Sequence, residues 1–167
     1  MHRFALMMVS RPKILVASTN IFSFGGSEMV CVRAIESLQA ECDITLVHTG
    51  GALDTDRIAA WSGKRLDPAR VQFITAPCPT LPGSLGNWAL IGYAFALRQV
   101  RAMAPHFDLI TSYFGECPIE HPNVLQYVPY PQFFFDKESL LYLGVEYSNP
   151  AKYGLRALYV MAARSIA

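Results

Sequence analysis

The chain has 167 residues, of which 52% are hydrophobic and 16% are charged, and its formal net charge is +1. This length is typical of one domain with a single core, and the composition excludes an intrinsically disordered chain. A net charge so close to zero offers no broad basic surface, so nucleic acid is not expected as a partner.

The first half of the chain alternates between strand and helix patterns. Residues 13–18, "KILVAS", form a short apolar run typical of a strand buried on both faces. A loop with Gly25 and Gly26 follows, and Ser27 is expected to cap a helix whose apolar residues recur at helical spacing. Glu28 is expected to face away from this apolar stripe. Further elements are predicted as strands over 43–51 and 70–77, with a short helix and loop over 54–67.

The second half continues the alternation. Residues 87–107 predict a long helix, with Asn87 as its cap and Pro105 at its end. The remaining predicted elements are strands over 108–114 and 123–131 and a helix from Asn149 and Pro150 to Ala167. Strands that alternate with helices predict an α/β fold, namely a Rossmann-like, mostly parallel sheet with helices on both faces.

Three further features concern the location of the protein. The cysteines form no CxxC pair, no histidine lies at metal-ligand spacing from them, and we expect buried thiols in a reducing, cytoplasmic compartment. These cysteines are Cys31, Cys42, Cys78 and Cys117. Residues 1–12 are interpreted as a leader without a secretion cleavage site, and no apolar run reaches the roughly 18 residues that span a bilayer.

Gly25 and Gly26 are predicted to lie at the edge of the sheet where doubly wound folds bind ligands. A backbone without side chains allows a ligand to approach, and N–H groups at a helix start favour phosphate. The alternative is a tight connection that needs positive φ. Because the stretch is neither GxGxxG nor a Walker loop, and His48 rather than an acidic residue ends the second strand, a nicotinamide-dependent oxidoreductase is disfavoured.

Residues 13–51 resemble the opening of glycosyltransferase family 4 enzymes, with a strand, a Gly-Gly-Ser-Glu loop, a helix and a second strand. The stretch "FDLITSYFGECPIEHPNVLQYVPYPQFF" is similar to the fourth and fifth strands of that family. The likeness covers roughly residues 13–165 and is strongest to the members that transfer mannose to lipid-linked oligosaccharides.

The resemblance implies the N-terminal, acceptor-side half of a GT-B enzyme that transfers a sugar with retention. A C-terminal domain outside this chain would hold most of the UDP- or GDP-linked sugar, and Gly25, Gly26 and Ser27 would approach its diphosphate. Neither a covalently bound cofactor nor a metal is implied. The acceptor would be a glycan or a lipid-linked sugar at the cytoplasmic face of a membrane. The chain, which we expect to be truncated before the donor domain, should be inactive alone.

The candidates for acceptor binding are His48, Glu116, His121, Tyr127 and Tyr130. For the two histidines and the glutamate, the alternative is a solvated or otherwise satisfied side chain. Relatives often carry a histidine where this chain has Pro129, which leaves the acceptor and full activity open. No catalytic residue is assigned.

Two alternatives remain from the sequence. The chain is either the glycosyltransferase half just described or a non-catalytic Rossmann-like module that binds a glycan or a nucleotide. Helix 87–107 is apolar around most of its circumference, which predicts a core helix. Docking of this helix, or of Phe133–Phe135, at a membrane interface and contact with a further domain are the other interpretations.

Overall fold

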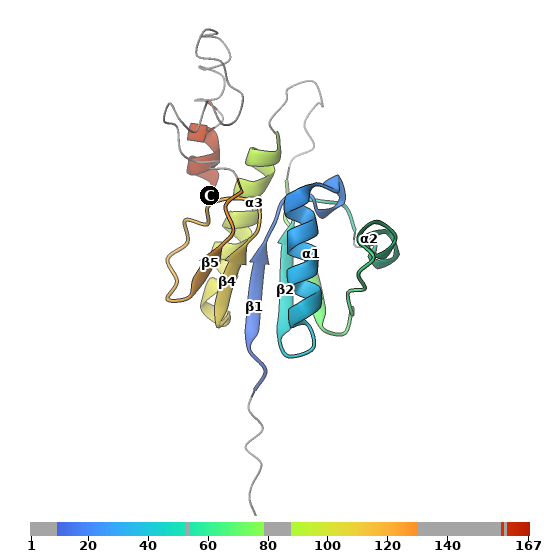
Figure 1. The fold of residues 1–167 in the computed structure, drawn as a ribbon. Helices are drawn as coiled ribbons and strands as arrows, with labels where there is room; N and C mark the ends of the chain where they lie inside the picture. The colour runs from blue at the N-terminus through green and yellow to red at the C-terminus, as the bar shows by residue number, and fades with distance from the viewer. Residues whose placement is uncertain (1–9, 53, 79–87, 130–157, 159) are drawn as a thin grey trace, which may run out of the picture.

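The computed structural model describes residues 10–52, 54–78, 88–129, 158 and 160–167 (Figure 1). Within these residues, one parallel sheet of five strands has the order β3-β2-β1-β4-β5. The strands are β1 (Lys13–Ala17), β2 (Asp43–His48), β3 (Val71–Thr75), β4 (Leu109–Ser112) and β5 (Val124–Gln126). The predicted Rossmann-like α/β fold is confirmed.

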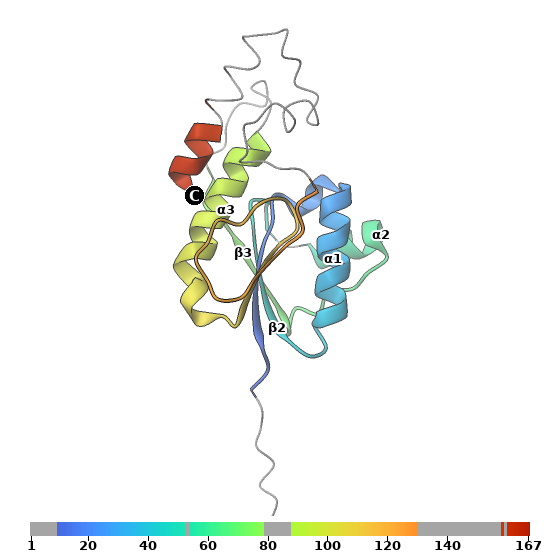
Figure 2. The same ribbon diagram turned by 60° about the vertical axis from the view of Figure 1, so that its left-hand side comes forward.

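Helices cover both faces of this sheet (Figures 1 and 2). On one face lie α1 (Gly26–Leu38) and α2 (Thr55–Ser62), and on the other lies α3 (Trp88–Met103). Two 3-10 turns flank them, η1 (Ile21–Ser23) before α1 and η2 (Ala104–His106) after α3. Residues 160–166 are helical and lie beside α3 in both views.

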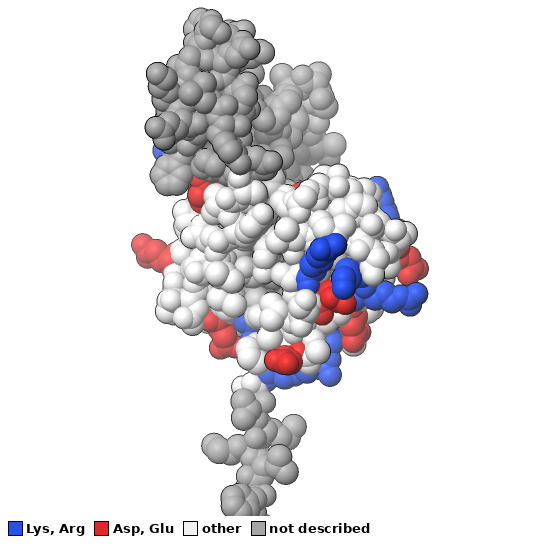
Figure 3. Space-filling model, viewed as in Figure 1, with Lys and Arg blue, Asp and Glu red and all other residues white. Residues whose placement is uncertain are grey.

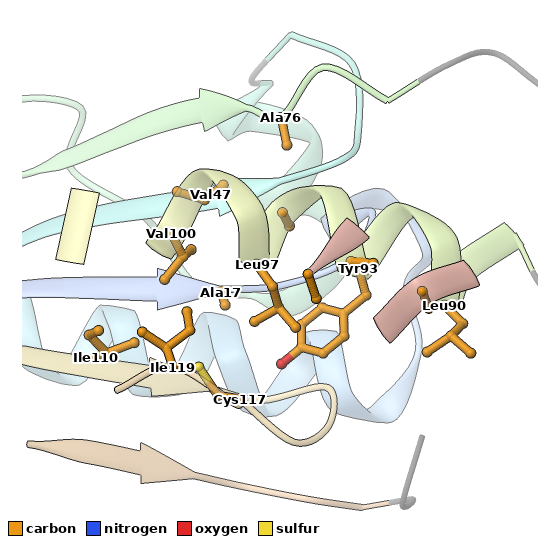
Figure 4. Close-up of a cluster of buried hydrophobic side chains, with 14 of the residues drawn as sticks. Ala17, Val47, Ala76, Leu90, Tyr93, Leu97, Val100, Ile110, Cys117 and Ile119 are labelled. Atoms are coloured by element: carbon orange, nitrogen blue, oxygen red, sulfur yellow. The ribbon is translucent and has the colours of Figure 1, made fainter. Parts of the chain in front are cut away.

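The central strands are buried beyond their first residue and are mostly apolar, because successive side chains enter two different cores. Ile14 and Val16 pack beneath α1 and α2, whereas Leu15 and Ala17 pack beneath α3. Figure 4 shows Tyr93, Leu97 and other α3 side chains directed at the sheet. The core interpretation of this helix is therefore confirmed, and no described helix is both long and apolar enough to cross a bilayer.

The connections explain why the carboxyl edge of the sheet can hold a site. From β1 through β2 to β3 the chain crosses over on the face of α1 and α2. It then proceeds in the reverse direction to β4 and β5 on the face of α3, where Cys117 and Ile119 are buried. All crossovers thus share one hand, and the order reverses between β1 and β4. Such a reversal opens a crevice at the carboxyl ends of the strands.

Several element ends differ from the predicted ones. β5 spans three residues instead of 123–131, and α3 ends at Met103 because Pro105 belongs to the turn η2. Asp54 caps α2 by accepting a hydrogen bond from the Arg57 N–H at 2.8 Å. On the face that carries α1, acidic and basic side chains are interspersed (Figure 3). The predicted cap Asn87 and the predicted helix start at 149–150 lie outside the described residues.

Candidate functional site

A cavity of about 350 Å³ lies at the carboxyl edge of the sheet, next to the reversal of strand order. We call it the switch-point cavity. Residues that follow the strands line it, namely Thr19 and Asn20 after β1, Thr49 after β2, Cys78 after β3 and Phe114 after β4. Glu28 of α1, Ser23 of η1 and Gly92 of α3 complete the described lining. The cavity occupies the place where doubly wound sheets bind ligands.

The glycine loop beside this cavity differs from its predicted form. Gly25, not Ser27, is the N-cap of α1, and its carbonyl accepts the first helical hydrogen bond from the Met29 N–H at 3.1 Å. The Ser27 hydroxyl instead donates to Oε2 of Glu28 at 3.0 Å. The predicted serine cap is wrong because the helix begins at Gly26, two residues earlier than a cap at Ser27 implies.

The two glycines have different surroundings. A Cβ atom on Gly25 would lie 2.5 Å from Oε2 of Glu28, so the missing side chain makes room for a carboxylate of the same chain. A Cβ atom on Gly26 would meet no heavy atom of the other described residues within 4 Å, beyond its chain neighbours and the backbone of α1. Neither glycine has positive φ; the left-handed residue of the loop is Phe24, at φ 59°. The alternative of a glycine turn with positive φ is therefore wrong.

Glu28 is only 5% exposed, although it was expected to face away from the apolar stripe. Its Oε1 accepts a hydrogen bond from the Thr19 hydroxyl at 3.1 Å, in addition to the bond from Ser27. The expectation fails because the first turn of α1 packs against the β1–α1 loop as well as against the sheet. A residue that lies off the apolar stripe of the helix can therefore be buried by the loop. A carboxylate in this turn is favourable because helix N-termini carry partial positive charge.

The α2 helix fixes the aromatic residues of the loop. The guanidinium carbon of Arg57 lies 4.8 Å from the ring centroid of Phe24 and 5.1 Å from that of Phe22. The Phe24 ring also packs against Trp61, with 4.9 Å between centroids. These cation–π and ring contacts hold Phe24 in a backbone conformation that is uncommon for a residue with a side chain.

His48 is fully buried and does not line the switch-point cavity. Its Nδ1 accepts a hydrogen bond from the Gly50 N–H at 3.0 Å, and its ring meets Phe22 and Phe73 edge to face. Burial lowers the pKa of this imidazole, and its Nε2 has no hydrogen-bond partner within the described residues. The structure therefore places this predicted acceptor residue beneath η1, in the packing of the α1 face.

The two candidates in the loop after β4 are separated. The Tyr93 hydroxyl donates to the Glu116 carbonyl at 3.1 Å, which keeps Glu116 near the carboxyl edge, although outside the cavity lining. His121 lies at the amino edge, where its Nε2 donates to the Phe107 carbonyl at 3.1 Å and its Nδ1 accepts from the Asn123 N–H at 3.1 Å. The expected place of His121 at the mouth of the cleft is wrong, because this loop must return to the amino edge before the parallel strand β5 begins.

The two tyrosines proposed for acceptor binding do not line the described part of the cavity. Tyr127 is 46% exposed, its N–H donates to the Ser112 carbonyl at 2.8 Å, and Tyr130 lies outside the described residues. Thr19, Asn20 and Thr49 do line the cavity, although they were not predicted as site residues. Their position directly after predicted parallel strands is the signal that would have identified them.

Three of the four cysteine thiols are buried, and burial raises the pKa of two of these three. Desolvation raises the pKa of Cys31 to about 12 and that of Cys117 to about 11, and Cys42 is buried as well. Cys78 is partly exposed at the cavity, so burial of all four thiols was predicted correctly for three. Within the described parts of the chain, no cluster of three or more histidine, cysteine or acidic side chains could hold a metal ion.

Comparison of the sequence with models of known protein families finds no match, and comparisons with curated proteins and with solved structures also find none.

Proposed function

We propose that this chain is the acceptor-side domain of a retaining glycosyltransferase whose donor is a UDP- or GDP-linked sugar. The proposal combines the sequence resemblance with a parallel sheet of matching type, in which the Gly-Gly-Ser-Glu segment follows β1 at the carboxyl edge. A further domain holds most of the donor, so the chain alone does not turn over. The acceptor is a glycan or a lipid-linked sugar at the cytoplasmic face of a membrane.

The observation that carries the proposal is the open space at Gly26. Apart from its chain neighbours and the backbone of α1, no heavy atom of the described residues lies within 4 Å of the position where its Cβ would sit, and the residue starts the first turn of α1. A diphosphate oxygen can therefore approach the N–H groups of this turn without a steric clash at Gly26. Gly25 and Ser27 are less suited to this role, because the Glu28 carboxylate fills the space at Gly25 and accepts the Ser27 hydroxyl.

The same carboxylate explains why the donor should bind weakly to this chain. Glu28 is buried at the positive end of α1 and forms no ion pair with a basic residue of the described chain. A diphosphate that approaches Gly26 meets this negative charge, and repulsion between like charges is strong where solvent is excluded. Tight binding requires cations from elsewhere, such as the other domain of a GT-B enzyme.

The experiment is a titration of the isotope-labelled chain with UDP-glucose and with GDP-mannose, followed by the chemical shifts of backbone amides. We expect millimolar binding that shifts the amides of residues 26–29, and loss of these shifts in Gly26→Val. Gly51→Val is the matched control, because a Cβ on Gly51 also meets no atom within 4 Å. Unchanged binding by Gly26→Val would refute the approach at Gly26, and micromolar binding by the chain would refute the proposed division between two domains.

A further inference from the structure

The switch-point cavity has one charged group in its described lining, the carboxylate of Glu28. The other polar side chains that line it are neutral, and no basic residue is among them. An anionic ligand in this cavity would meet a negative charge without a compensating cation, which is costly in a partly buried site. The charge of the lining therefore favours a neutral ligand that donates hydrogen bonds.

The lining can form more hydrogen bonds than the chain itself provides. A carboxylate accepts about four hydrogen bonds, whereas Glu28 receives two from the described residues, those of Thr19 and Ser27. Asn20 accepts a bond from the Phe22 N–H at 3.0 Å through Oδ1, while its amide NH₂ donates to no group of the described chain. Acceptor and donor groups thus line the same space, which suits hydroxyl groups because each hydroxyl can both donate and accept.

Glycines leave room for these two polar side chains, and hydrogen bonds to Thr19 and Ser27 hold Glu28 while the Phe22 N–H holds Asn20. A Cβ atom on Gly25 would lie 2.5 Å from the Glu28 carboxylate, and one on Gly50 would lie 2.6 Å from Oδ1 of Asn20. Each polar group therefore occupies a space that any other residue at the glycine position would fill. A site whose polar groups are held in place before binding loses less entropy when the ligand binds.

We infer that the switch-point cavity binds one neutral sugar residue of the acceptor, with Glu28 and Asn20 bonded to its hydroxyl groups. Its volume of about 350 Å³ is near the lower limit of small-molecule sites, which suits a single sugar ring and excludes a whole nucleotide sugar. Phe114 supplies an apolar wall for the C–H face of the ring. The assignment of this sugar to an acceptor rests on the proposed function. The sugar site is distinct from Gly26, where the donor diphosphate is proposed to approach.

Cys78 provides a direct test because it lines the cavity and is partly exposed. The native chain is treated with a maleimide, and modification of Cys78 is measured by peptide mass spectrometry. The added probes are glucose, galactose, mannose and N-acetylglucosamine, each at millimolar concentrations, and inorganic pyrophosphate in parallel. We expect at least one of the sugars to slow the modification, and pyrophosphate to leave it unchanged.

Matched variants of α1 identify the residue responsible. Glu28→Gln should bind the protecting sugar about tenfold more weakly, because it replaces a charged acceptor by a neutral one. Glu36→Gln, on the same helix and paired with Lys64 at the surface, should bind it as the native chain does. If Glu28→Gln does not fold, Asn20→Ala is the second variant, with the same expected loss.

The outcomes separate this inference from the proposed function. Failure of every sugar to protect Cys78, or protection by pyrophosphate, would overturn the inference even if nucleotide sugars bind at Gly26. Protection that is equal in the native chain, Glu28→Gln and Asn20→Ala would overturn it as well. Sugar protection that depends on Glu28, without nucleotide-sugar binding at Gly26, would support the sugar site, refute the diphosphate approach at Gly26 and favour a glycan-binding module.

Discussion

The Glu28 carboxylate and Gly25 are fitted to each other, since Oε2 of Glu28 lies 2.5 Å from the point where a Cβ on Gly25 would sit. This fit places a buried negative charge beside the first turn of α1 and leaves Gly26 as the open position of the loop. It explains Gly25 by a contact within the chain, whereas the role that we propose for Gly26 depends on a ligand that approaches from solvent.

Replacement of the two glycines by alanine should therefore have unequal effects on stability. Gly25→Ala displaces a buried carboxylate from its bonds to Thr19 and Ser27, and we expect it to lower the free energy of unfolding by about 1–2 kcal/mol. Gly26→Ala meets open space and should leave the free energy of unfolding within about 0.5 kcal/mol. Urea denaturation measures both.

A double-mutant cycle links the first effect to its cause. In a chain that carries Glu28→Ala, the Gly25→Ala change should lose most of its cost, because no carboxylate remains to be displaced. If Gly25→Ala destabilises both backgrounds equally, the contact with Glu28 does not explain the glycine.

Arg57 should stabilise the glycine loop through the rings of Phe22 and Phe24, which lie 5.1 and 4.8 Å from its guanidinium carbon. Arg57→Ala should lower the free energy of unfolding by about 1 kcal/mol, because each such contact is worth roughly 0.5–1 kcal/mol at an exposed site. It should also shift the amide resonance of Phe24. Arg33→Ala, which removes an exposed arginine of α1, is the control, and an equal loss there would argue against the cation–π contacts.

His48 should make stability depend on pH on the acid side. Burial lowers its pKa below the ordinary value of 6.5, so the unfolded chain binds the proton more readily than the native one. The contribution of the neutral imidazole to the free energy of unfolding is complete above about pH 6.5. It is lost as the pH falls from there through the native pKa of His48, by no more than about 1.4 kcal/mol per pH unit.

The measurement for His48 is urea denaturation at a series of pH values. His48→Gln should flatten the decline between about pH 6.5 and pH 5, whereas His106→Gln, at an exposed position, should retain it. A decline of the same slope in His48→Gln would assign the pH dependence to other groups.

The thiols should react in the order of their exposure. At about pH 8, Cys78 should be alkylated first, because the pKa of Cys31 is raised to about 12 and that of Cys117 to about 11. The three buried thiols, Cys31, Cys42 and Cys117, should react fully only in denaturant. Mass spectrometry of the modified peptides follows each site, and early modification of Cys31 in native protein would contradict its burial in the α1 core.

The fold was predictable from the sequence because hydrophobic patterns extend over whole elements. The apolar runs at β1 and β2 and the mostly apolar α3 each indicate burial through residue type and spacing alone. Element ends were less predictable, since Gly25 rather than Ser27 caps α1 and this depends on one backbone conformation.

The site was predicted only in part, for a different physical reason. The glycine loop was located from the order of strand and helix, which is a local pattern. The burial of Glu28 and the distance of His121 from the carboxyl edge depend on loops whose course no period in the sequence encodes. Residues such as Thr49, directly after a strand, could have been identified from the parallel topology alone.

Addition of UDP-glucose and a protecting monosaccharide together, with backbone amide shifts recorded for the whole chain, tests the account most directly. We predict two separate groups of shifts, one in the first turn of α1 from Gly26 onward and one at Thr19, Thr49 and Cys78 around the cavity. Shifts confined to the amino edge near His121, or no shifts at either place, would contradict a glycosyltransferase site at the carboxyl edge of this sheet.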